Sequence, residues 1–494
     1  MSTEVVTRED EQQTAEPRLI QRWGAASAAF TAVALIFGFV FAWITPPFWA
    51  HDEITQFGRA YQVAHGGLLP QEIDDDRGVS YGGRIPASID ELMGYALRDY
   101  NNNPPEPDPM VQDPGGYDRL ESAPVSDAQR TMWFTNTASY SPLPYLPAAL
   151  GIRIAESVGL DVGAVSLAAR LAGLAVYLAI VGFGLQALRA WRIQWLAFTV
   201  AVLPIAVFQA GTVTADTLTN ALAIVVSALL VKALFLGSPL NRIETAALLT
   251  SAVALPLCKP SYVLVAMLVV LVPPAALGFG GALRRWLPWA FAAIGALAFL
   301  AWTRIAAPTT EGMGLMRRQE QWHSVIPADQ LAGMVRDPIG FVSTFGQSIA
   351  RRDQEWFTEF FGELGFSYVT VPALSIIASL LALVVSVGIA ERLVSSHLRT
   401  ALVAVAVAAS VALIYVALYL SFTPVGYFII DGVQGRYFVP LAVLAFAVLL
   451  RWMPLRFTRA DGTLPPRAPA VTIVTATVIG LIAAAVKYYA FVWG

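Results

Sequence analysis

Residues 24–45 read GAASAAFTAVALIFGFVFAWIT, and residues 46–70 continue with PPFWAHDEITQFGRAYQVAHGGLLP. The first stretch has no charged residue and is long enough to cross the hydrocarbon core of a bilayer as one α-helix. The second stretch begins with two prolines, which end a helix, and then places Asp52 and Glu53 just beyond the apolar residues. Together they predict a membrane-spanning helix followed directly by an acidic, amphipathic segment.

Apolar stretches of this kind recur along the whole chain. Of its 494 residues, 56% are hydrophobic and 14% are charged, whereas soluble proteins carry about 25% charged residues. The formal net charge of -3 argues against nucleic-acid binding. We predict an all-α integral membrane protein with about eleven transmembrane helices, near residues 24–45, 163–187, 194–210, 217–236, 243–257, 261–280, 286–307, 369–389, 400–421, 437–453 and 469–490.

Basic residues set the expected orientation, because they are held on the cytoplasmic side of short loops. With residues 1–23 as a disordered cytoplasmic tail, every predicted inner loop is basic. From the first inner loop to the last, the basic residues are Arg189 and Arg192, Lys232 and Arg242, Arg284 and Arg285, Arg392 and Arg399, and Arg451, Arg456, Arg459 and Arg467. If Pro142 to Val158 crossed the membrane, the arginine clusters after it would lie on the outer side. We therefore expect this segment to lie along the outer interface. We therefore predict a multi-pass protein of the plasma membrane with a cytoplasmic N-terminus.

Two predicted extracellular loops interrupt a single transmembrane domain that covers residues 24–494. The first loop covers residues 46–162 and, up to Tyr140, holds 15 acidic residues against 6 arginines and no lysine. The second covers residues 307–368 and is rich in Trp, Arg and Gln. Loops longer than about 12–15 residues usually carry function or are disordered. We expect interfacial helices in the first loop and substrate contacts in both.

Asp52 and Glu53 form a carboxylate pair close to the predicted outer surface. Such a pair can act as a general base or bind a cation, whereas acidic residues after an outward span are often simply solvated. Neighbours on a helix point about 100° apart. Only one of the two is therefore expected to face a reacting atom.

Five motifs carry a resemblance to a known family: HDEITQFGRAYQVAHGG (51–67), YGGRIP (81–86), SYSPLPYLPAAL (139–150), ELGF (363–366) and GVQGRYFVPL (432–441). Through them the chain resembles the DUF2142 family of polytopic membrane proteins, which is related to the GT-C glycosyltransferases. The resemblance implies a GT-C-like helical bundle with a catalytic acid in the first outer loop. It also implies a polyprenyl-phosphate-linked sugar donor and, as acceptor, an extracellular glycan, lipid or protein of the cell envelope. Membrane lipids are the remaining expected partners.

The chemistry of such a transfer gives roles to individual residues. The attacking hydroxyl must lose its proton, so Asp52 is the preferred base and Glu53 the alternative. The lipid phosphate leaving group needs fixed cations, and we select Arg436 and Lys259 at predicted outer helix ends, with Gln434 beside them. The alternatives are a Lys259 that reaches toward water and an Arg436 that only binds loop carbonyls.

Substrate contacts are assigned to Asp216, Trp322, His323, Arg59 and Tyr140. Asp216 follows a threonine and precedes an apolar stretch, which is also typical of a helix N-terminus. No two histidines have metal-ligand spacing on one helix. Asp52, Glu53 and Asp216 have enough oxygens for a divalent cation, but we favour a metal-independent enzyme because lysine and arginine suffice for a monophosphate.

Two other functions remain compatible with the sequence. A transporter or flippase for a lipid-linked solute explains the number of spans, but it predicts charged or broken sites near mid-membrane. A polymerase or ligase for lipid-linked glycans typically has its large loop late in the sequence. The acidic loop after the first span favours the glycosyltransferase.

Overall fold

The computed structural model describes residues 24–102, 109–316, 319, 324–366, 369–453, 457 and 467–494, and it is mostly helical. Its apolar stretches are helical because a helix satisfies every backbone group within its own segment, which a bilayer requires. The long helices of the bundle are α2 (Ala25–Ile44), α8 (Val162–Ala187), α11 (Ala215–Leu230), α12 (Arg242–Cys258), α14 (Leu287–Ala306), α17 (Ala373–Ile389), α18 (His397–Ser421), α19 (Val439–Trp452) and α20 (Ala468–Val492).

Seven segments in the described part of the chain are long and apolar enough to cross a membrane. They are Ala25–Ile44, Val162–Ala187, Ala215–Phe235, Leu287–Leu315, His397–Ser421, Gly435–Trp452 and Ala468–Val492. Pro260–Leu271 and Ala373–Ile389 are apolar but shorter. The chain is therefore a multi-pass membrane protein whose membrane part is helical, and this criterion gives fewer spans than the eleven predicted.

Prolines explain where the helices depart from the predicted spans. The predicted span 194–210 is divided into α9 (Gln194–Ala201) and α10 (Pro204–Ala210), because Pro204 has no N–H to continue the first helix and instead begins the second. The predicted span 261–280 is too long. Its helical turns η3 (Pro260–Tyr262), α13 (Val263–Met267) and η4 (Leu268–Leu271) end before Pro273 and Pro274.

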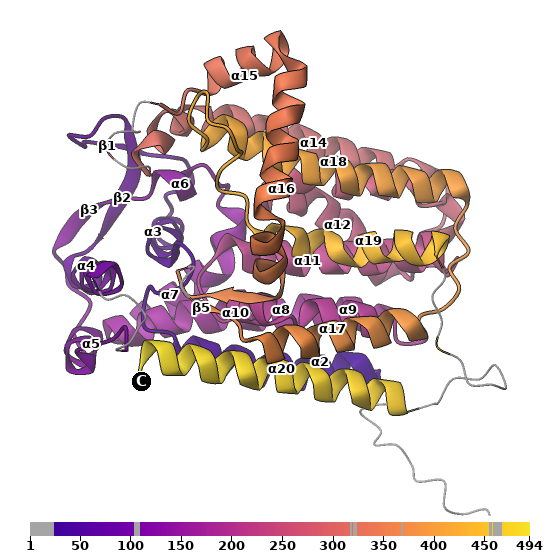
Figure 1. The fold of residues 1–494 in the computed structure, drawn as a ribbon, viewed down its shortest axis with the longest axis horizontal. Helices are drawn as coiled ribbons and strands as arrows, with labels where there is room; N and C mark the ends of the chain where they lie inside the picture. Colours follow the sequence, from indigo (N-terminus) through magenta and orange to yellow (C-terminus); the bar gives the residue numbers. More distant parts are fainter. Residues whose placement is uncertain are drawn as a thin grey trace, which may run out of the picture.

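The long helices lie side by side in one bundle (Figure 1). At its centre is α11, which packs against α8, α12 and α19 and is buried along its whole length. The outer helices α14 and α18 instead expose large apolar side chains such as Leu297 and Val405. Apolar surface of this extent is suited to contact with lipid. The remaining short turns of this part are η2 (Val231–Phe235), η5 (Pro274–Ala276) and η6 (Ala282–Arg285).

Residues 46–161, here called the loop lobe, cover one end of the bundle, at the left of Figure 1. The lobe contains α3 (Glu53–Ala64), β1 (Glu72–Ile73), β2 (Ser80–Pro86), α4 (Ala87–Asn102), α5 (Pro114–Glu121), β3 (Gln129–Trp133), α6 (Thr135–Ala138), η1 (Leu143–Tyr145) and α7 (Leu146–Ser157). Strand β2 pairs antiparallel with both β1 and β3. A Cβ at Gly82 would lie 2.0 Å from the carbonyl oxygen of Met132, so only glycine fits between these strands. The sequence predicted helices here but not this sheet.

The second long connection lies at the same end of the bundle. It forms η7 (Ala307–Met316), α15 (Pro327–Arg336), α16 (Pro338–Gly362) and the short pair β4 (Glu363–Leu364) and β5 (Val369–Thr370). Turn η7 packs against α6 and β2, and α16 packs against η9 (Gly435–Phe438), the turn that leads into α19. The chain's last residues also reach this end, where the N–H groups of Met110 and Val111 donate to the carbonyls of Phe491 and Val492 at 3.0 and 2.9 Å. We call it the loop end.

Candidate active site at the loop end of the helix bundle

Asp52 lies at the turn between α2 and α3. The prolines Pro46 and Pro47 follow the end of α2, and the chain then reverses into α3. Phe48 (φ 68°) and Asp52 (φ 53°) both adopt left-handed backbone conformations, which cost about 1–3 kcal/mol each in a residue other than glycine. The surrounding contacts must therefore hold this turn in place, and they fix the position of Asp52.

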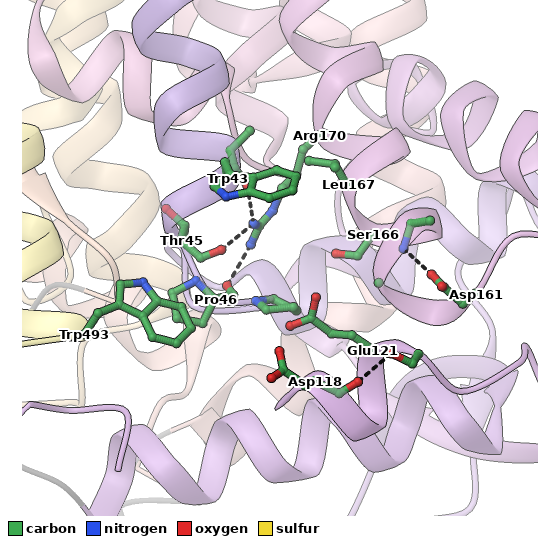
Figure 2. A pocket seen from close by; sticks show the side chains of 15 residues that line it. Trp43, Thr45, Pro46, Asp118, Glu121, Asp161, Ser166, Leu167, Arg170 and Trp493 are labelled. Atoms are coloured by element: carbon green, nitrogen blue, oxygen red, sulfur yellow. Dashed lines mark hydrogen bonds between the residues drawn. The ribbon is translucent and has the colours of Figure 1, made fainter. Parts of the chain in front are cut away.

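Glu53 and Arg170 provide the strongest of these contacts. Both side chains are buried, and Arg170 donates from Nε to Oε1 of Glu53 at 2.7 Å and from Nη2 to Oε2 at 2.6 Å. Glu53 also accepts from the N–H groups of Val213 at 3.0 Å and Ala50 at 3.2 Å. The other Arg170 hydrogens bind the carbonyls that end α2, those of Ala42, Thr45 and Pro46 (Figure 2). Glu53 is thus fully occupied as a structural residue, which favours Asp52 as the base.

Asp216 is surrounded by polar hydrogens from three separate parts of the chain. Its Oδ1 lies 2.7 Å from Lys259 Nζ, and its Oδ2 lies 2.9 Å from Gln209 Nε2 and 3.7 Å from Arg436 Nε. The N-cap of α11 is Thr214, whose hydroxyl accepts from the Asp216 N–H, so the Asp216 carboxylate itself is available for these ion pairs. Lys259 reaches Asp216 from the extended break between α12 and η3 and lies 3.9 Å from the centre of the Tyr437 ring.

Asp52, Asp216, Lys259 and Arg436 form what we call the charged cluster. Burial raises the pKa of the Asp52 carboxyl, the positive charges of Arg436 and Lys259 oppose this shift, and the negative charge of Asp216 adds to it. These mutual effects require that the four groups lie near one another. A carboxyl with a raised pKa is a better proton acceptor than an ordinary one once it is ionised.

Arg436 has unused hydrogen-bonding capacity. It is 7% exposed, and its Nε and Nη1 find no hydrogen-bond partner among the described residues. The same holds within the described residues for Oε1 of Gln434 and Nδ1 of His51, which border, together with Arg436, a gap too narrow to hold a water molecule. Burial, followed by the charge of Arg436, lowers the pKa of His51, so this imidazole is neutral. Buried polar groups are normally hydrogen-bonded, so a ligand would satisfy this unpaired set once the surrounding side chains move apart to admit it.

Helix α16 supports the turn that carries Arg436 through Glu359 and Trp356. Glu359 accepts from the N–H of Gly435, and Trp356 Nε1 donates to the carbonyl of Val433 at 2.9 Å. A Cβ at Gly435 would lie 2.0 Å from the carbonyl oxygen of Trp356, so glycine allows α16 to approach this closely. Burial, and then the hydrogen bond with Glu359, raises the pKa of Glu363 to about 8. Burial also raises the pKa of Glu359.

The other predicted substrate residues fall in different places. Tyr140 is beside the charged cluster, since burial raises its pKa to about 12 while Lys259 lowers it and Asp52 adds to the rise. Arg59 is buried inside the loop lobe, where it donates to the carbonyls of Gly67 at 3.0 Å and Leu68 at 2.8 Å and so fixes the end of α3. Trp322 and His323 lie outside the described residues.

A metal site does not emerge from the geometry of the described residues, in which no three His, Cys, Asp or Glu side chains are grouped to hold an ion. Glu53 faces Arg170, and Asp216 faces Lys259 and Arg436. Two of the three carboxylates considered as ligands are thus already neutralised by cations. The single cysteine, Cys258, is buried.

Several residues at the site had no role in the sequence-based prediction. The sequence could have pointed to three of them. His51 is the neighbour of Asp52, and Glu359 and Glu363 in EWFTEFFGEL are four residues apart, which places them on one face of a helix. Gln209, which links Asp216 to Asn220, had none, because only the fold brings the end of α10 to the start of α11.

Residues 35–445 match the family DUF2142, described as a predicted membrane protein, and the chain belongs to this family. No curated protein and no solved structure shows significant similarity to the chain.

Proposed function

We propose that this member of the DUF2142 family is a membrane glycosyltransferase with a GT-C-like architecture. It takes a sugar from a polyprenyl-phosphate-linked donor and transfers it to a glycan, lipid or protein of the cell envelope. The observation that carries the proposal is the buried Arg436, with two donor nitrogens unpaired within the described residues, in the same cluster as Asp52, whose pKa is raised.

The phosphate side of the reaction uses Arg436, Lys259 and Gln434. Arg436 Nε lies 3.7 Å from Asp216, too far for a hydrogen bond, so a phosphate oxygen would displace no hydrogen-bond partner from this donor. The side chains around it must move to admit the phosphate. Hydrogen bonds between guanidinium and phosphate are charge-assisted and frequently bidentate. A buried cation stabilises the charge that develops on the leaving phosphate more strongly than one in water does.

The base in this mechanism is Asp52. The acceptor oxygen forms a bond to the anomeric carbon and gives its proton to the Asp52 carboxylate, while the bond between the anomeric carbon and the phosphate oxygen breaks. The lipid monophosphate leaves with the bonding electron pair and is held by Arg436 and Lys259. Glu53 takes no part in proton transfer and, through Arg170, holds the turn that presents Asp52.

The proposed topology has eleven crossings, in which the paired or shorter segments 194–210, 243–257, 260–271 and 373–389 complete the seven long spans. The N-terminus is then cytoplasmic and the loop end extracellular in the plasma membrane. A flippase is less well supported, because ionisable residues in the long spans lie close to helix ends. Arg170 and Arg304 lie farther inside their spans, and Glu53 neutralises Arg170.

Binding of a polyprenyl monophosphate to the protein in lipid nanodiscs tests the phosphate site. We expect Arg436→Ala and Lys259→Ala to weaken binding by about tenfold or more, because each removes a charge-assisted contact. Arg436→Lys should restore little if the contact is bidentate. Arg351→Ala, a change at an exposed arginine of α16, is the matched control and should bind normally. Wild-type affinity in Arg436→Ala would remove this residue from the site.

Transfer of label from radioactive polyprenyl-phosphate sugars, supplied to membranes that contain the protein, tests the base. Asp52→Asn keeps the side-chain shape and removes its basicity, so we expect turnover to fall by roughly 10²-fold or more while polyprenyl monophosphate still binds. Near-normal turnover of Asp52→Asn would show that the base lies elsewhere.

A further inference from the structure

A second concave site lies on the other side of the turn that carries Asp52. It is a cleft of about 440 Å³ between the end of α2, the start of α8, helix α5 and Trp493 (Figure 2). Thr45 and Pro46 of the turn that leads to Asp52 line it, and so does Arg170. The cleft therefore abuts the turn that positions Asp52 but is lined by different side chains.

The cleft contains a hydrogen-bonding group that the described part of the protein leaves unpaired. Ser166 is 2% exposed, its hydroxyl makes no hydrogen bond within the described residues, and Figure 2 shows that hydroxyl turned into the cleft. The carboxylates of the exposed Asp118 and the half-buried Glu121 also line the cleft. A buried hydroxyl without a partner costs about 1–3 kcal/mol, and this cost is removed when a ligand supplies the partner.

The charge of the cleft is opposite to what a phosphate requires. Asp118, Glu121 and Asp161 are acidic, and the nearby Arg170 is already neutralised by Glu53. Like charges repel, so an anionic ligand is disfavoured here. No metal-binding group is formed in the described chain either. The fitting ligand is a donor of several hydroxyl groups that carries no negative charge.

The aromatic walls narrow the ligand class further. Trp43 is 67% exposed at the end of α2, and Trp493 faces the cleft from the opposite side. Tryptophan offers a wide apolar face beside polar surroundings, and a pyranose ring has an apolar face edged by hydroxyl groups. Carboxylates that accept hydroxyl hydrogens beside indole rings thus match a saccharide and not a simple alkyl chain.

We propose that this cleft binds an uncharged saccharide and is the acceptor site of the transfer. The assignment of the saccharide as acceptor rests on the proposed function. Saccharide binding itself stands on the cleft alone. The two sites then divide the substrates by charge, with the phosphate donor at the charged cluster and the neutral acceptor at the acidic cleft. The turn from Thr45 to Glu53 separates them.

The experiment measures binding of dodecyl maltoside, whose headgroup is an uncharged disaccharide, to the full-length protein in nanodiscs, with empty nanodiscs subtracted. We expect saturable binding by the wild type. The Glu121→Gln/Ser166→Ala variant should bind about tenfold more weakly or worse, because a charged acceptor and a buried hydroxyl are lost. Glu72→Gln, a change at an exposed glutamate of the same lobe, is the matched control and should bind normally.

Polyprenyl monophosphate binding by the same proteins separates the two proposals. The Glu121→Gln/Ser166→Ala variant should bind it with wild-type affinity, and this result also shows that the variant is folded. Arg436→Ala should lose the phosphate and keep the maltoside. Equal maltoside affinity in wild type and Glu121→Gln/Ser166→Ala, or no saturable binding at all, overturns the saccharide site and leaves the phosphate site standing. Loss of phosphate binding alone in Arg436→Ala supports both sites.

A comparison with free maltose identifies the source of the saccharide. Equal affinities for maltose and dodecyl maltoside indicate a soluble glycan, and tighter binding of the maltoside indicates a membrane glycolipid. Both results support the site. Binding of dodecylphosphocholine that depends on Glu121 and exceeds that of the maltoside overturns it in favour of a cationic headgroup.

Discussion

The ion pair between Glu53 and Arg170 gives the sharpest test of how the turn at Asp52 is held. Glu53→Gln keeps the size of the side chain and removes its charge, which leaves the Arg170 guanidinium buried without a counter-charge. Removal of one partner of a buried ion pair typically destabilises a protein by about 3–5 kcal/mol. Since total stabilities are only about 5–15 kcal/mol, the variant should lose a large part of its stability.

The single cysteine makes this change measurable in detergent or nanodiscs. Cys258 is fully buried, so a thiol-reactive fluorogenic dye reports global unfolding when the temperature rises. Glu53→Gln should unfold at a clearly lower temperature than the wild type. Asp52→Asn is the matched control, because its carboxyl has no such ion pair, and it should unfold near the wild-type temperature. Unfolding of Glu53→Gln at the wild-type temperature would refute the structural role of the pair.

A double variant distinguishes the effect of the unpaired Arg170 charge on stability from the effect of losing the Arg170 hydrogen bonds. Glu53→Gln/Arg170→Gln contains no unpaired buried charge, so it should be more stable than Glu53→Gln alone. It should remain less stable than the wild type, because the carbonyls that end α2, those of Ala42, Thr45 and Pro46, lose their donor.

Three further predictions concern topology and pH. Cysteine at Ser122 should react with an impermeant thiol reagent in intact cells and cysteine at Val394 should not, since these exposed residues lie at opposite ends of the bundle; labelling of Val394 alone would invert the proposed orientation. Only ionised Asp52 accepts a proton, and its pKa is raised above 3.8, so kcat/KM should begin to fall at a pH above that value, and a fall confined to lower pH would contradict the role of burial. Glu363, with its pKa raised from 4.5 to about 8, keeps a proton in the folded state that the unfolded state has lost, so stability should decrease as the pH rises from about 4.5 to about 8. Glu363→Gln should remove this slope, and an unchanged slope would assign it to another group.

The apolar stretches and their arginine-rich connections predicted most of the helices, because length and composition are local properties of the sequence. The extent of 261–280 was wrong, since Pro273 and Pro274 end the helix earlier. The sheet of the loop lobe was missed because β1 has only two residues and the pairing of β2 with β3 depends on contacts distant in sequence.

The charged cluster could be predicted in part, because a lysine and an arginine at apolar helix ends are unusual wherever they occur. Asp52, Asp216, Lys259 and Arg436 were selected individually and lie together in the structure. The sequence could not separate Asp52 from Glu53, because the difference depends on Arg170, which is more than a hundred residues away. The acidic cleft could not be predicted from the sequence either, since the residues that line it come from four separate parts of the chain.

The backbone bonds from Met110 and Val111 to Phe491 and Val492 impose an order on biogenesis. Ribosomes add about 5–20 residues per second, so residue 492 follows residue 111 after roughly 20–75 s. Trp493, which donates to the carbonyl of Ile44 and lines the acidic cleft, arrives equally late. During translation the N–H groups of Met110 and Val111 in the loop lobe therefore lack their partners until α20 docks. Chaperones or the insertion machinery have this interval in which to shield them.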